Sequence, residues 1–249
     1  MTGSPPPPAP LRISELTPDE ARAAATAVPR LILPAGTTEQ HGSHLPLGAD
    51  TLVVERLADD LSAEFRVLRA PAIVYGVNDP LRNRFSGGAS VRRKTLRRWV
   101  NDLLPDWEQL GISEILVLTM NAYAPHLEAL GTVVAQRARI RVIDILAMDF
   151  GEIIEHPEDP IHGGELDTSL VLFLRPDLVR MESALDHILP EQHLRRYRRG
   201  RSIMVPAGSK GSVGRASKAS ADKGKRLYEF ILARIRERVF LTNSDSGTG

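Results

Sequence analysis

The sequence contains no cysteine, few aromatic residues and almost no net charge. Without cysteine, the 249-residue chain can form neither disulfide bonds nor a thiolate metal site. Its formal net charge of +1 argues against bulk nucleic-acid binding, because proteins of that class carry a basic patch or stripe. No apolar run approaches the ~20 residues that a membrane-spanning helix needs. We therefore expect a cytoplasmic protein that has neither nucleic acid nor a membrane as its partner.

The composition, with 42% hydrophobic and 25% charged residues, fits one globular domain with a substantial core. The segment 1–10, MTGSPPPPAP, has neither a basic head nor an apolar core, so we expect a disordered lead-in rather than a secretory signal. We place a single domain at residues 11–240 and a flexible tail at 241–249.

Segments with strand and helix periodicity alternate along the chain, which is typical of an α/β layered sheet. Pro105 is expected to kink or break the helix in which it lies, and Ser14 and Thr17 are candidate caps for the first helix. Residues 166–173 are predicted as a helix or a strand. The predicted strands are 30–33, 67–74, 114–120 and 140–146, and the predicted helices are 13–26, 51–65, 91–110, 127–137 and 219–239.

The most informative stretch is 37–51, TTEQHGSHLPLGADT, which follows the first predicted strand. It contains Glu39, His41, His44 and Asp50 within twelve residues. Carboxylates and imidazoles on a loop at the carboxyl end of a strand suit zinc, manganese or iron(II). A polar surface loop is the alternative interpretation. The repeated glycine and proline residues between two apolar elements favour a metal site.

This stretch resembles the signature of the creatininase family of metal-dependent amidohydrolases, in which E-x-H is followed nine residues later by Asp. The segments HGGELDTSLVLFLRPDLV (162–179) and GSVGRASKASADKGKRLYE (from 211) resemble later blocks of the family, so the similarity spans roughly residues 30–235. The resemblance implies a three-layer α/β/α fold with a mostly parallel central sheet, one or two divalent metals, and often a hexamer. It implies metal ligands at Glu39, His41 and Asp50.

The sequence departs from the family pattern at the third site segment. The family carries N-G-H-G-G-N there, or N-G-H-Y-E-N in creatininase itself, whereas residues 121–126 read NAYAPH. Tyr123 stands in place of a ligand histidine, and Pro125 stands in place of creatininase's ligand glutamate. In the later block Asp167 replaces a glutamate and is one methylene shorter. We therefore predict one ion per subunit, zinc in the first place with manganese or iron as alternatives, unless His126 supplies a further ligand. The predicted ligands are Glu39, His41, Asp50 and Asp167.

The residues and the resemblance together predict a metal-dependent hydrolase that cleaves a C–N bond, possibly of a cyclic amide, in a small molecule of a specialised biosynthetic pathway. His162 is the predicted proton donor to the leaving nitrogen. Tyr123 either binds a substrate carbonyl or fills space that a metal would occupy. The arginine clusters at 92–98 and 195–201 form either a solvated face or subunit contact, or a site for an anionic substrate.

Two other interpretations stay open. A catalytically degenerate member of the family would serve as a scaffold or partner subunit. A non-hydrolytic enzyme on the same fold would use Tyr123 as an acid.

Overall fold

The computed structural model describes residues 8–79, 85–159, 162–198 and 207–241. Its centre is a five-stranded sheet in which every pairing is parallel and the strand order is β1-β3-β2-β4-β5. The central strands are buried along almost their whole length, as expected for a parallel sheet covered on both faces. The strands are β1 (Leu11–Arg12), β2 (Arg30–Ala35), β3 (Leu68–Arg69), β4 (Glu114–Thr119) and β5 (Arg139–Asp144).

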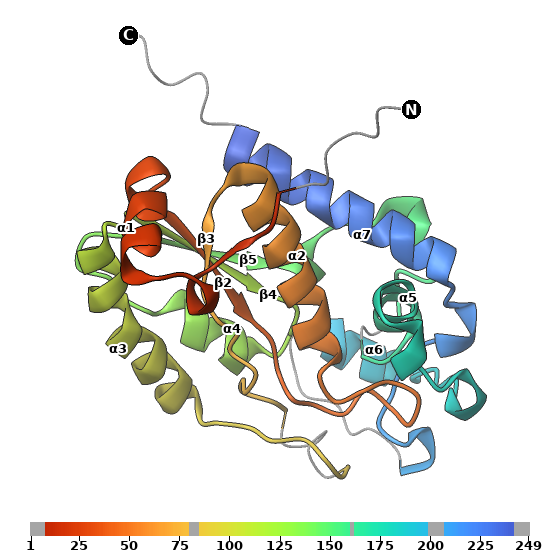
Figure 1. Cartoon of the computed structure of the whole chain (residues 1–249). Helices are drawn as coiled ribbons and strands as arrows, with labels where there is room; N and C mark the ends of the chain where they lie inside the picture. The colour runs from red at the N-terminus through yellow and green to blue at the C-terminus, as the bar shows by residue number, and fades with distance from the viewer. Residues whose placement is uncertain (1–7, 80–84, 160–161, 199–206, 242–249) are drawn as a thin grey trace, which may run out of the picture.

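Helices cover both faces of this sheet (Figure 1). Alternate residues of β2 point to opposite sides, so Ile32 packs in one apolar cluster and Leu31 and Leu33 pack in another. The first cluster is closed by α2, α5 and α7, and the second by α1, α3 and α4. The seven helices that the described residues form are α1 (Pro18–Ala27), α2 (Ala49–Phe65), α3 (Arg93–Leu110), α4 (Ala124–Gly131), α5 (Glu165–Leu174), α6 (Glu191–Arg198) and α7 (Ala221–Ile235), which a π-helical turn (Arg236–Leu241) follows.

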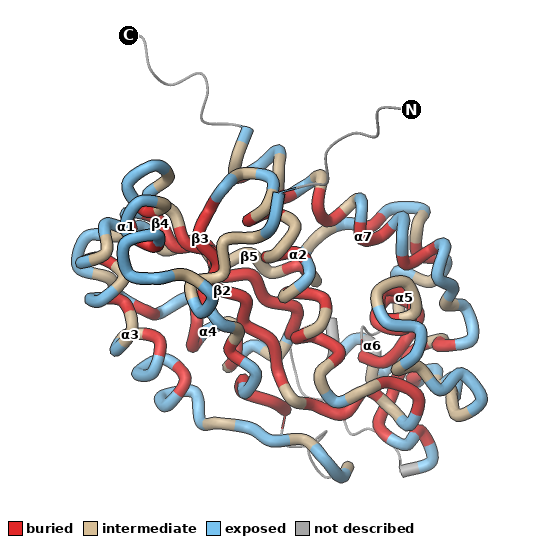
Figure 2. The backbone as a smooth tube through the Cα atoms, viewed as in Figure 1, coloured by how far each residue is buried: buried red, intermediate tan, exposed pale blue. Residues whose placement is uncertain are grey.

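The predicted three-layer α/β/α fold is confirmed. Figure 2 shows the buried backbone concentrated in the sheet and on the inner sides of the helices around it. The packing of α5 against α7 is so close that a Cβ atom on Gly224 would come within 1.9 Å of the carbonyl oxygen of Ser169. Within the described residues, no helix is both long and apolar enough to cross a membrane.

Several predicted boundaries shift. Helix α1 begins after Thr17, whose side chain forms a capping box with Glu20, and not near Ser14. Helix α3 continues through Pro105, because that residue faces solvent and water can bond the carbonyl group that the proline leaves without a partner. Of the predicted strand 67–74, only Leu68–Arg69 forms a regular strand, and Ile73 adds an isolated parallel bridge to Ala35. The segment 166–173 is helical, as α5.

The parallel strands all end at the same edge of the sheet, and the chain leaves β2, β4 and β5 there in irregular segments. Ligand sites of open α/β sheets form at this carboxyl edge. Residues 1–7 and 242–249, which contain most of the two predicted flexible ends, lie outside the described residues, and the division into domains stays a prediction.

Candidate active site

Side chains from four segments converge on a small buried cavity at the carboxyl edge of the sheet. Its volume is about 10 Å³, which is about the space that one water-sized occupant needs. The loop after β2 and the start of α2 supply one wall, the segment after β4 supplies another, and the residues that lead into α5 complete it. The lining residues are Glu39, His41, Asp50, Met120, Asn121, Ala122, Leu146, His162 and Asp167.

The imidazole of His41 is held between a carbonyl group and a carboxylate. Its Nδ1 atom lies 3.1 Å from the carbonyl oxygen of Glu39 and its Nε2 atom lies 3.1 Å from Oδ1 of Asp50. Because a carbonyl oxygen can only accept, Nδ1 carries a proton and donates it, and Nε2 faces the carboxylate. This is the usual way in which proteins orient a histidine that binds metal through Nε2.

The charges around His41 outweigh the effect of its burial. Burial alone would lower the pKa of this imidazole, but the negative charges of Asp50, Asp167 and Glu39, together with the hydrogen bond to Asp50, raise it to about 10. The cavity therefore concentrates negative potential. In the protein without metal, a proton on His41 partly neutralises the charge of the carboxylates.

Each of the three carboxylates has one oxygen fixed by a donor from the surrounding protein. The hydroxyl of Thr37 donates to Oδ2 of Asp50 at 2.6 Å, and the amide of Asn121 donates to Oε2 of Glu39 at 3.0 Å. The N–H of Gly163 donates to Oδ2 of Asp167 at 2.6 Å. Such bonds orient a carboxylate before a ligand arrives.

Glycine at position 163 is what allows the segment before α5 to reach the loop after β2. Its φ of +66° lies in the left-handed region, and a Cβ atom there would come within 2.4 Å of the carbonyl oxygen of His41. This close approach places Asp167 and His162 in the same cavity lining as Glu39 and His41.

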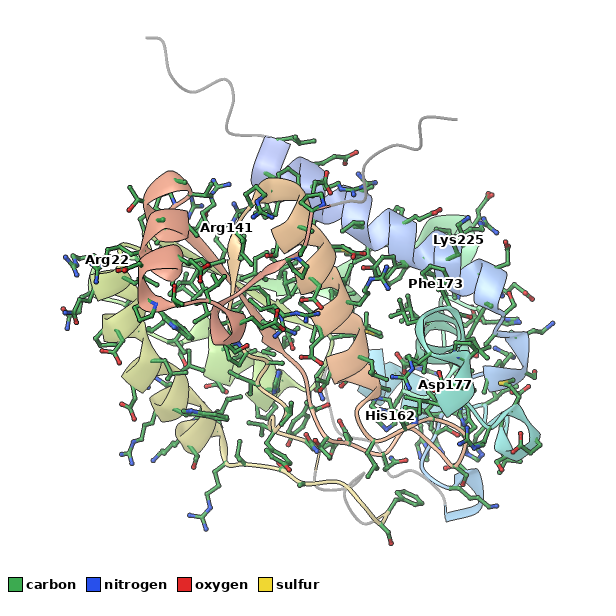
Figure 3. The ribbon with its side chains drawn as sticks, viewed as in Figure 1. Arg22, Arg141, His162, Phe173, Asp177 and Lys225 are labelled. Atoms are coloured by element: carbon green, nitrogen blue, oxygen red, sulfur yellow. The ribbon has the colours of Figure 1, made fainter. Side chains whose placement is uncertain are left out.

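His162, labelled in Figure 3, lies on the segment that leads into α5 and is buried beside His41, with 4.6 Å between the ring centroids. Its Nε2 atom is 3.1 Å from Nε2 of Gln40. Gln40 was not anticipated from the sequence, although its position between Glu39 and His41 was a signal that could have found it.

The donor atoms present suit one divalent ion. Bond lengths of about 2.0–2.1 Å place two ligands of a tetrahedral zinc roughly 3.3 Å apart, and the His41 and Asp50 atoms lie 3.1 Å apart. Among the described residues, no group of three or more His, Asp or Glu side chains is arranged so that it could hold a metal ion as the side chains stand. The residues fit an ion in the type of their donor atoms and in the spacing of His41 and Asp50. The carboxylates would have to move closer together to complete a ligand set.

His126 does not supply the additional ligand. It is fully buried, and its Nδ1 atom accepts a hydrogen bond from the N–H of Val77 at 3.1 Å. The ring proton therefore lies on Nε2, which donates to the hydroxyl of Thr119 at 3.0 Å. Both nitrogens are used in holding the start of α4 to the end of β4 and to the segment after β3.

Tyr123 precedes α4, and its backbone N–H donates to Oδ1 of Asn121. Its side chain packs against the apolar cluster on the α1, α3 and α4 face, and it is not among the residues that line the cavity. The structure thus brings Glu39, His41, Asp50, Asp167 and His162 together without the tyrosine ring, and the catalytic role of Tyr123 stays a prediction.

Within the part of the chain that the structure describes, neither arginine cluster enters the cavity lining. Arg92, Arg93, Lys94, Arg97 and Arg98 are exposed at the start of α3, and Arg93 forms an ion pair with Glu128. The second cluster lies partly at 199–201, outside the described residues.

Comparisons with known proteins agree on one family. The family model described as creatinine amidohydrolase (Creatininase) matches residues 14–239. A creatinine amidohydrolase from Pseudomonas putida is 25% identical over 230 residues, covering 84% of this chain and 88% of that protein. A mycofactocin precursor peptide peptidase from Mycolicibacterium smegmatis (strain ATCC 700084 / mc(2)155) is 27% identical over 222 residues, covering 85% of each. A solved structure described as "Creatininase Mn" superposes with a TM-score of 0.76 at 24% identity, over 92% of this chain and 98% of that one.

Proposed function

This chain belongs to the creatininase family, and on that premise we propose that it is a metal-dependent hydrolase that cleaves a C–N bond of an amide in a small molecule. The relatives named above hydrolyse creatinine or a precursor peptide by their descriptions. Creatinine itself is an improbable substrate, because the ligand positions of creatininase hold Tyr123 and Pro125 in this chain. We infer a specialised biosynthetic substrate instead.

The observation that carries this proposal is the convergence of three buried carboxylates and one imidazole on a cavity of ion size. Glu39, Asp50 and Asp167 are each at most 3% exposed. Burying several carboxylates together is costly unless a cation compensates them. We assign to Glu39, His41, Asp50 and Asp167 the role of holding one ion, zinc in the first place, with manganese or iron as alternatives.

When bound, such an ion would polarise a substrate carbonyl and lower the pKa of water from its bulk value toward ~7. The protein's own residues then orient the reaction. Thr37, Asn121 and Gly163 fix the carboxylates, and the Glu39 carbonyl fixes the ring of His41. The leaving nitrogen needs a proton, for which we propose His162 as the source.

The binding experiment that tests this proposal does not depend on knowing the substrate. Metal content is measured in purified wild-type protein and in Glu39→Ala and Asp50→Ala, with Asp102→Ala on the exposed side of α3 as the matched control. We expect close to one ion per chain in the wild type and the control, and its loss in the two site variants. Added zinc or manganese should raise Tm only where the site is intact. Retention of metal by both site variants would disprove the assignment.

A degenerate family member that acts as a scaffold is the second candidate. The observation that favours it is the third site segment, where Pro125 lies in the first turn of α4 and both nitrogens of His126 are engaged elsewhere. Such a protein would purify without stoichiometric metal and would gain no thermal stability from zinc or manganese. The same measurements therefore separate the two candidates.

A further inference from the structure

A second, larger cavity adjoins the candidate active site. Its volume is about 220 Å³, and Leu146 lines both cavities. Its walls come from the segment after β5 and from the start of α5, where Leu166 directly precedes Asp167. The two cavities are therefore neighbours at the carboxyl edge of the sheet, with Leu146 between them.

The walls of this cavity are mainly apolar. Phe150 and Ile154 are buried in the main core cluster at 7% and 9% exposure, so this part of the wall is fixed by packing. Apolar walls that are held in place select an occupant by shape and by the water that it displaces. The apolar lining residues are Leu146, Met148, Phe150, Ile154, Pro157 and Leu166.

Four ionisable side chains also line the cavity, and each of them already has a partner in the protein. Asp149 accepts from the N–H of Gly151, and His156 lies 3.1 Å from Glu158. The other two form ion pairs, Asp159 with Arg215 and Glu165 with Lys223. An anionic substrate group would meet the carboxylates of this lining, whose cationic partners are already engaged by Asp159 and Glu165. A cationic group would have to compete with Arg215 or Lys223, except at the exposed Asp149.

We propose that this cavity is the specificity pocket of the enzyme, and that the substrate carries an un-ionised apolar group, aliphatic or aromatic, next to the amide that is cleaved. The inference rests on the proposed function, because it takes the smaller cavity as the place of cleavage. It adds to that function the chemical class of the group beside the scissile bond.

The test uses N-acetyl amino acid amides, Ac-X-NH2, with X as Leu, Phe, Gly, Lys or Glu. Each compound places its side chain next to an amide on both sides, so the pocket is probed whether it serves the acyl or the amine part. Binding to the zinc-loaded full-length protein is measured by calorimetry, and products are measured by mass spectrometry. We expect the Leu and Phe compounds to bind roughly tenfold more tightly than the Gly, Lys and Glu compounds.

Met148→Trp should fill the cavity and abolish this preference, and Met148→Glu should do so by placing a charge in it. Met181→Trp is the matched control, because Met181 is partly exposed and lies outside this lining. Preserved metal content and Tm show that each variant is folded. Equal binding of all five compounds, or an unchanged preference in both Met148 variants, would overturn the proposal.

The two proposals fail in different ways. Bound metal and amide cleavage without an apolar preference would refute the pocket and leave the hydrolase. Selective binding of the Leu and Phe compounds without metal or cleavage would refute the hydrolase and leave an apolar binding site.

Discussion

Gln40 donates its side-chain N–H to Nε2 of His162 across 3.1 Å. The direction of this bond follows from the other contacts of the amide. Its Oε1 atom accepts from the N–H of Gly42 at 2.9 Å, and its Nε2 atom lies 3.1 Å from the carbonyl oxygen of Gly211, to which it can only donate. Nε2 of His162 is therefore an acceptor, and the proton of the neutral ring lies on Nδ1.

This arrangement bears on how His162 can protonate a leaving group. Full transfer of a proton requires the ring to carry protons on both nitrogens beforehand, and a protonated Nε2 would meet the N–H group of Gln40. The imidazolium form is then reached only when Gln40 turns away or reverses its amide. We therefore expect Gln40 to disfavour the imidazolium form of His162.

Replacing Gln40 with glutamate should favour the charged ring. In Gln40→Glu the amide is exchanged for an acceptor that attracts the imidazolium, so the midpoint of the His162 titration, followed by NMR, should move to higher pH by about one unit or more. Gln192→Glu, on the exposed side of α6, is the matched control and should leave that midpoint unchanged. An unmoved midpoint in Gln40→Glu would show that the amide does not control the ring.

Metal binding should strengthen as the pH rises. An ion that binds Nε2 of His41 must displace the proton whose pKa the neighbouring carboxylates raise to about 10. Below that value one proton is released for each ion bound, so the apparent affinity should increase about tenfold per pH unit between pH 6 and 9. Competition with a chelator of known affinity measures this slope. A flat profile would mean that His41 is not a ligand.

The sequence predicted the fold for identifiable physical reasons, and the structure brings the predicted site residues to one cavity. Glu39, His41 and Asp50 lie in one loop and the helix start after a buried strand, so proximity in the chain implies proximity in space. The capping box of Thr17 and Glu20 depends only on residues close in the chain, and helix α1 begins at this capping box.

Contacts between distant segments were harder to anticipate. The sequence alone left open whether His126 pointed toward the site, because its partners Thr119 and Val77 come from two other segments. The positioning role of Gln40 depends on Gly211, which lies 171 residues away in the chain. Neither relationship leaves a periodic or compositional signal.

Gly163 should tolerate no side chain. In Gly163→Ala the new Cβ atom would lie 2.4 Å from the carbonyl oxygen of His41, and the residue would be forced into a left-handed conformation with φ of +66°. Strain of this kind costs on the order of 1–3 kcal/mol, and it should separate Asp167 from His41. We expect a lower Tm and loss of bound metal. Gly208→Ala is the matched control, because a Cβ there meets nothing within 4 Å. Equal Tm values and equal metal contents in the two variants would refute the close approach of Gly163 to the carbonyl oxygen of His41.

Acid should destabilise the protein through a histidine that is buried in its neutral form. Burial lowers the pKa of His126 to about 4, against about 6.5 in an unfolded chain. Between these pH values the unfolded state binds a proton that the folded state does not. The contribution of neutral His126 to the free energy of unfolding is therefore fully present above pH 6.5 and is lost as the pH falls toward 4.

At pH 5, about 1.5 units below the unfolded-state pKa, protonation of this histidine should lower the free energy of unfolding by about 2 kcal/mol, at about 1.36 kcal/mol per pH unit. Urea unfolding of the metal-free protein at pH 7 and pH 5 measures it. His126→Gln should be less stable than the wild type at pH 7, because a cavity and imperfect hydrogen bonds replace the ring, but it should lose about 2 kcal/mol less on acidification. His187→Gln, at a partly exposed position, is the control and should keep the wild-type dependence. If His126→Gln lost stability as steeply as the wild type, the neutral ring between Thr119 and Val77 would not be a source of the acid sensitivity.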